Sequence, residues 1–133
     1  GLVCVSICSA EYKPKSVPTV ETIPSAEEVR AYIAEGHDPV MRFHQKPKGG
    51  QGEGARLIDV IEGGRPKDAS SLGYTMLLKY PDPVDDIHLT EGAPISNQLI
   101  EVVLLLAHDL GIKNVYAYSR PGALASYLST KKV

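Results

Sequence analysis

The chain has 133 residues, of which 43% are hydrophobic and 23% are charged, so it has the size and composition of one globular domain. Its formal net charge of −2 and its pI near 6.1 exclude nucleic-acid binding driven by a bulk excess of basic side chains. The longest apolar run, residues 99–107, is interrupted by Glu101 and is far shorter than the roughly 20 residues that a membrane span needs. We therefore expect a single domain that binds neither nucleic acid nor membrane.

The first predicted element is a buried strand over residues 2–7, which is rich in Val and Ile. Cys4 and Cys8 are the only cysteines, and along a strand they would lie roughly 13 Å apart, too far for a disulfide. Their spacing is not that of a metal site, so we expect reduced thiols, no metal and an intracellular, cytoplasmic location. Because the chain begins with Gly1, we expect a processed product or an excised part of a larger protein.

Two helices with clear start signals follow. Ser25 and Glu28 have the spacing of a capping box, and the helix that they start carries an apolar stripe up to Gly36. Asp38 can cap a second, short helix over residues 39–45, whose first position is a proline. These signals predict two helices separated by a short turn.

Two strands are predicted next, at residues 56–61 and 74–80. The Gly-rich segment 46–54 before the first strand has the composition of a mobile loop, and Pro81 ends the second strand. A long helix over residues 94–110 follows; it is apolar on nearly every side. A helix of that kind is expected to be buried in the sheet layer or in an oligomer.

The last predicted elements are a strand at residues 114–119 and a short helix at residues 121–128. Helices and strands therefore alternate along the chain. This order predicts an α/β domain, a mixed β-sheet covered by helices.

Several sequence blocks resemble bacterial-type domains of the GNAT (GCN5-related N-acetyltransferase) family. The blocks are D-P-V-M-R-F-H at Asp38 to His44, G-A-R at Gly54 to Arg56, R-P-K-D at Arg65 to Asp68, and L-G-Y-T-M-L-L-K-Y at Leu72 to Tyr80. Residues 110–121 resemble the end of a family helix and the central strand after it, but that piece comes first in the family. The resemblance implies a GNAT-like fold with permuted blocks, and it places strand 114–119 in the centre of the sheet beside strand 56–61 or strand 2–7.

The resemblance implies transfer of an acyl group from acetyl-CoA or another acyl-CoA to an amine. The family binds the pyrophosphate of CoA at a helix N-terminus, where free N–H groups attract anions. The equivalent stretch here is residues 90–97, and it makes Gly92, Ser96 and Asn97 the candidate contacts. The stretch departs from the family pattern because Glu91 adds a negative charge and Pro94 removes a donor. The alternative is an ordinary helix N-terminus.

The resemblance also suggests a catalytic residue. In the family, the helix equivalent to residues 39–45 often carries a tyrosine that protonates the departing CoA thiolate, and Phe43 and His44 occupy that place here. His44 could donate a proton near neutral pH. The alternative is a structural histidine that fixes the helix to a neighbouring loop.

Tyr116, Tyr118 and Arg120, on and just after the predicted central strand, are the remaining candidate contacts of acyl-CoA. The alternatives are tyrosines that line the core or a pocket and an ordinary surface arginine. Two other functions stay open: a non-catalytic GNAT-like interaction or scaffolding domain, in a homo-oligomer or a larger parent protein, and a GNAT-like domain with other acyl-thioester chemistry.

Overall fold

The computed structural model describes residues 20, 22–50, 53–81 and 87–130. The described elements are four helices and three strands, which confirms the predicted α/β character. The predicted strand 2–7, with Cys4 and Cys8, lies outside the described residues. In chain order the elements are α1 (Ala26–Ala34), α2 (Pro39–Gln45), β1 (Arg56–Ile61), β2 (Thr75–Tyr80), α3 (Ile95–Asp109), β3 (Val115–Ser119) and α4 (Leu124–Thr130).

The three strands form one antiparallel sheet in the order β1-β2-β3. β3 pairs with β2 and not with strand 56–61. The other expected neighbour, strand 2–7, lies outside the described residues, so that alternative stays a prediction. The physical reason for the observed pairing is the burial of β2, whose Met76 and Leu78 are fully buried and whose Tyr80 is nearly so. The strand with the most buried apolar surface takes the middle of the described sheet, and β3 lies at its edge.

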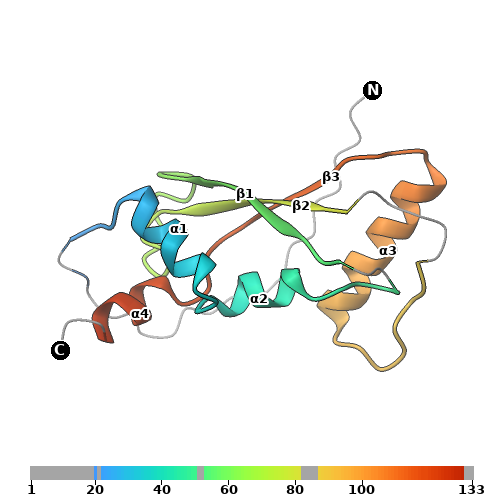
Figure 1. The fold of residues 1–133 in the computed structure, drawn as a ribbon, viewed down its shortest axis with the longest axis horizontal. Helices are drawn as coiled ribbons and strands as arrows, with labels where there is room; N and C mark the ends of the chain where they lie inside the picture. Colours follow the sequence, from blue (N-terminus) through green and yellow to red (C-terminus); the bar gives the residue numbers. More distant parts are fainter. Residues whose placement is uncertain (1–19, 21, 51–52, 82–86, 131–133) are drawn as a thin grey trace.

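Helices cover one face of the sheet. Side chains of a strand alternate between faces, and on β3 the inward set, Val115 and Ala117, packs against the core while Tyr116 and Tyr118 are exposed. Figure 1 shows α1 and α4 towards one end of the molecule and α3 at the other. The buried core draws on every element except β3: Val29, Tyr32, Ile33, Met41, Ala55, Val60, Tyr74, Met76, Leu78, Tyr80, Ile87, Leu104 and Leu124.

The start signals of α1 and α2 are confirmed. Ser25 Oγ accepts the Glu28 N–H at 3.2 Å, and the Glu28 carboxylate accepts the Ser25 N–H at 3.4 Å, which together form the predicted capping box. Asp38 Oδ2 accepts the Met41 N–H at 2.8 Å at the start of α2. Local hydrogen bonds therefore begin both helices where the sequence indicates.

The last helix begins later than predicted, at Leu124 and not at residue 121. The N–H groups of Gly122 and Ala123 instead donate to Asp38 Oδ1, at 2.6 and 3.4 Å. A Cβ at Gly122 would lie 2.5 Å from Val40 Cγ2. The segment between β3 and α4 is thus a turn that packs closely on α2, which only a glycine permits.

The long helix α3 packs on the core through one face only. Glu101, Leu104 and Ala107 are buried, whereas an exposed apolar row runs along another face. That face is therefore not buried in the sheet layer of the described residues, and the alternative expectation, burial in an oligomer, stays a prediction. We call the row the α3 stripe; it consists of Ile95, Leu99, Val102, Leu106 and Leu110.

Candidate functional site

His44, the candidate catalytic residue, is buried on α2, with 9% of its surface exposed. Its Nδ1 atom shares a hydrogen bond with the hydroxyl group of Tyr80, at the end of β2. Burial, helped by the nearby charge of Lys48, lowers the pKa of His44 to about 4. The ring is therefore neutral near pH 7 and is held against the sheet, as a structural histidine would be.

Lys48 is a buried cation that the sequence does not reveal. Its side chain is 1% exposed, and Nζ donates to the Phe43 carbonyl at 2.6 Å and lies 3.9 Å from the centre of the Phe43 ring. Burial lowers the pKa of Lys48, although the charge of Glu101 opposes that effect. The described part of the segment expected to be a mobile loop is thus anchored, because the long side chain of Lys48 reaches back to the end of α2.

Glu101, on the buried face of α3, is the second buried charge. Its carboxylate accepts the N–H of Thr90 at 2.6 Å and the side-chain amide of Asn97 at 2.6 Å. It also accepts the N–H of Gly49 at 3.2 Å and the hydroxyl group of Thr90. Burial alone would raise the pKa of Glu101, but these hydrogen bonds outweigh it and the net shift is downward. The sequence gives one signal for this role, a single acidic residue inside an apolar helix.

The hydrogen bonds of Glu101 determine which donors remain for a phosphate at the predicted pyrophosphate site, residues 90–97. Gly92 and Ser96 are exposed, but the amide of Asn97 and the N–H of Thr90 are already bonded to Glu101. A second carboxylate, Glu91, is exposed on the same loop. Two negative charges and occupied donors make this helix N-terminus a poor site for a phosphate.

Tyr116 and Tyr118, the candidate acyl-CoA contacts on β3, are exposed on one face of the sheet. Tyr116 lies opposite Lys79 and Tyr118 opposite Leu77 in the pairing with β2, and both rings are on the face of the sheet away from the core. They are 52% and 65% exposed, so neither lines the core of the described residues. Their alternation with inward residues is visible in the sequence, but which set faces the core is not.

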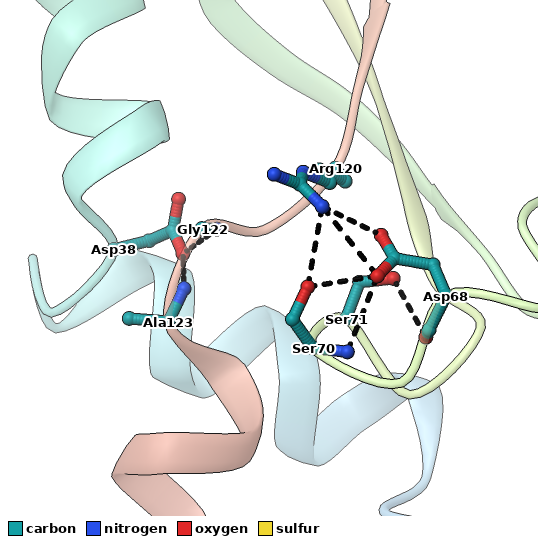
Figure 2. A network of polar contacts seen from close by, with 7 residues as sticks. All are labelled: Asp38, Asp68, Ser70, Ser71, Arg120, Gly122 and Ala123. Atoms are coloured by element: carbon teal, nitrogen blue, oxygen red, sulfur yellow. Dashed lines mark hydrogen bonds and ion pairs between the residues drawn. The ribbon is translucent and has the colours of Figure 1, made fainter. Parts of the chain in front are cut away.

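Arg120 contacts a carboxylate of this chain. As Figure 2 shows, its Nη1 atom lies 3.3 Å from Asp68 Oδ2 and donates to Ser70 Oγ at 3.3 Å. Burial would raise the pKa of Asp68, but hydrogen bonds from Ser70, Ser71 and Arg120 and the charge of Arg120 lower it overall. This ion pair fixes the end of β3 to the loop before β2, which is a structural use of a residue predicted to contact an anion.

Figure 2 also shows Asp38 beside Gly122 and Ala123. The carboxylate of Asp38 is fully buried and, besides capping α2, accepts the hydroxyl group of Tyr32 at 2.7 Å. One side chain therefore connects α1, α2 and the turn before α4. The sequence shows its capping role but not its contacts with the other segments.

The predicted site residues do not gather into one cluster. Tyr80 pairs with Val115, so the His44 ring lies near the beginning of β3, whereas Arg120 lies beyond the other end. Five residues of strand separate those ends by roughly 16 Å. The described residues thus contain a buried polar region around His44, Lys48 and Glu101 and, apart from it, an exposed aromatic strand.

In the described part of the chain, no group of three or more His, Cys, Asp or Glu side chains is placed to hold a metal ion. None of the helices found there has the length and apolar character of a membrane span. A scan against protein-family models, a search of curated proteins and a search of solved structures found no match.

Proposed function

We propose that this chain is a GNAT-like domain that binds an acyl-CoA along the side of β3 that no described strand pairs with, and that it transfers the acyl group to an amine. The observation that carries the proposal is the set of sequence blocks that resemble the family, whereas β3, which within the described residues pairs with β2 alone, departs from the central position that the resemblance implies. Alternate residues of such a strand direct N–H and C=O groups away from the sheet. The sequence blocks described above supply the resemblance to acyltransferases.

The chemistry of CoA suits a strand edge like that of β3, which no described strand covers. Its pantetheine arm is an extended chain with amide groups, which can exchange hydrogen bonds with an open strand as an added peptide strand does. Tyr116 and Tyr118 would supply exposed rings beside that edge. The proposal therefore moves the binding site from the N-terminus of α3, where two carboxylates oppose a phosphate, to β3.

The reaction would be direct. The amine nitrogen attacks the thioester carbonyl carbon, the C–S bond breaks, and the proton that the nitrogen loses balances the one that the CoA thiolate gains. His44 as the donor of that proton stays a prediction, and its buried, neutral ring favours a structural role.

Two measurements test this function. Acetyl-CoA titrated into the isotope-labelled protein should shift the amide resonances of residues 115–119, and free CoA thiol should appear when a primary amine is added. Tyr116→Ala and Tyr118→Ala should each lower thiol release at least tenfold. Leu89→Ala, at an exposed apolar residue outside the sheet, is the matched control and should leave it unchanged. Absence of both signals at millimolar acetyl-CoA would contradict the proposal.

The second candidate is a non-catalytic GNAT-like interaction domain, and the α3 stripe favours it. Monomeric proteins rarely expose a contiguous apolar row of this kind without a partner. A chain that neither shifts with acetyl-CoA nor releases thiol, but associates through α3, is the result expected for this alternative.

A further inference from the structure

We propose that the face of the sheet away from the core, which we call the outer face, binds the nucleotide part of acyl-CoA. The adenine ring would lie on Tyr116 and Tyr118, and the phosphates would lie beside Arg56. This inference rests on the acyl-CoA function proposed above and names the surface that takes the nucleotide. It stands on three observations: a row of side chains across the sheet, two positive charges in that row, and two exposed aromatic rings.

The first observation is a row of three side chains that crosses all three strands. Arg56 of β1 lies opposite Lys79 of β2, and Lys79 lies opposite Tyr116 of β3. Residues directly opposite each other in antiparallel strands share a face, with Cβ atoms about 4.5–5.5 Å apart. The next residue of β2, counted back along the chain, is the fully buried Leu78, so this row lies on the outer face. The row spans roughly 10 Å, which is two strand spacings.

The second observation is the pair of positive charges in the row. Like charges directly opposite each other destabilise a sheet, so Arg56 and Lys79 carry a cost that folding does not explain. Lys79 is half-buried and has a further interaction within the chain, whereas Arg56 is exposed. The other ionisable residue of β1, Asp59, is paired with Arg30 of α1. An anion beside Arg56 would relieve the repulsion, and a guanidinium group suits phosphate oxygens.

The third observation is the pair of exposed rings. More than half of Tyr116 and of Tyr118 is exposed, and residues two apart on a strand stand roughly 7 Å from each other. Aromatic side chains on the open face of a sheet are stacking surfaces for bases, because every base has a flat π-face. Leu77 lies opposite Tyr118 and adds apolar surface beside its ring. An adenine ring would therefore find stacking surface next to the two cations.

The charge of the chain selects a single nucleotide over a nucleic-acid strand. A nucleic-acid strand is held mainly by many phosphate contacts with Lys and Arg. The three described strands carry two cations, Arg56 and Lys79, and the whole chain has a formal net charge of −2. Two cations match one diphosphate group and do not extend along a strand of nucleic acid.

The nucleotide should bind weakly without the pantetheine arm. Arg56 is exposed, so water and salt screen its attraction for a phosphate. We therefore expect a millimolar dissociation constant for ADP, which shares the adenine ring and the diphosphate group of CoA. The outer face would thus orient acyl-CoA more than it tightens its binding.

ADP titrated into protein with isotope-labelled tyrosine tests the site. The ring resonances of Tyr116 and Tyr118 should shift as ADP is added. Adenosine, which lacks the phosphates, should bind at least threefold more weakly than ADP. Pantetheine, which lacks the nucleotide, should bind equally well to wild type and to Arg56→Glu.

Variants of Arg56 separate binding from folding. Arg56→Glu should raise the dissociation constant of ADP at least threefold, because it reverses the charge beside the phosphates. Arg56→Gln should also weaken ADP binding but slightly raise the melting temperature, since it removes one of two like charges that lie opposite each other. An arginine with a purely structural role would instead lower the melting temperature when replaced. Arg65→Glu, at an exposed arginine in the loop after β1, is the matched control and should leave the dissociation constant unchanged.

Unshifted resonances of Tyr116 and Tyr118 at millimolar ADP would overturn the inference, and so would equal dissociation constants for wild type and Arg56→Glu. A single-stranded oligonucleotide that binds at least a hundredfold more tightly than ADP would also overturn it, since the outer face would then be a nucleic-acid site. ADP binding without thiol release would support the nucleotide site and contradict the acyltransferase function. Thiol release by a chain that does not bind ADP would give the opposite result.

Discussion

His44, Lys48 and Glu101 are ionisable side chains that this small protein buries, and each obtains hydrogen bonds that offset the cost of leaving water. The three side chains offset this cost in different ways. Lys48 donates to the Phe43 carbonyl of α2, and Glu101 accepts from Gly49, Thr90 and Asn97, whereas His44 avoids the cost by losing its charge. This difference makes His44 the residue whose titration should be visible in the stability of the fold.

We predict that the stability falls as the pH falls from about 6.5 to about 4, and that His44→Phe removes this part of the fall. The pKa of His44 is about 4 in the folded state and near 6.5 in the unfolded chain, so the unfolded chain binds more protons in that interval. The contribution is fully present above the unfolded value and amounts to on the order of 3 kcal/mol at 1.36 kcal/mol per unit. Urea unfolding at a series of pH values measures it.

The same variant separates the two roles of His44. At pH 7 it leaves the Tyr80 hydroxyl group without its partner, which should cost about 1–3 kcal/mol of stability. A structural histidine predicts that loss with activity per folded molecule unchanged, whereas a general acid predicts at least a tenfold fall in turnover. Tyr80→Phe is the control, because it breaks the same hydrogen bond and keeps the imidazole.

At the scale of elements, the two helix caps Ser25 and Asp38 differ in the number of elements that they contact. Ser25 forms an exposed capping box that involves α1 alone. Asp38 begins α2 and is also bonded to Tyr32 on α1 and to the turn before α4. The second cap should therefore hold the helical layer together as well as start a helix.

We predict that Asp38→Ala lowers the free energy of unfolding by about 2–4 kcal/mol, against about 1 kcal/mol for Ser25→Ala. The larger value follows because truncation of Asp38 leaves buried donors from three segments without an acceptor. Chemical denaturation of the two variants beside wild type measures the difference.

Asp38→Asn serves as the matched variant, since its amide oxygen can still accept some of these hydrogen bonds, and it should fall between the two. Equal losses for Asp38→Ala and Ser25→Ala would mean that the contacts with Tyr32 and Gly122 contribute little.

At the scale of the whole molecule, we predict that acetyl-CoA binds with a dissociation constant weaker than micromolar. The anion site that would anchor the phosphates faces Glu91 and Glu101, and Arg120 is already paired with Asp68. Backbone contacts along β3 would then have to supply most of the affinity. Titration calorimetry tests this, and a micromolar constant, about −8 kcal/mol, would show that a phosphate anchor exists elsewhere.

The sequence by itself determined the helix and strand positions closely. The signals that set these positions act over a few residues, so they can be recognised in neighbouring positions of the sequence. They are the caps Ser25 and Asp38, the glycines that end helices, and the apolar strands. The strand β1 and the helix α2 have the predicted bounds, and α1 begins at the predicted cap.

Only the tertiary structure decided the pairing of β3, the burial of Lys48 and Glu101, and the face of α3 that stays exposed. These depend on contacts between residues far apart in the chain: His44 and Tyr80 are 36 positions apart, and Gly122 and Asp38 are 84 apart. A local pattern fixes which side chains share a face, but the choice of the face that leaves water depends on what packs against it. For that reason the sequence located Tyr116, Tyr118 and the apolar residues of α3, and the fold determined that they are exposed.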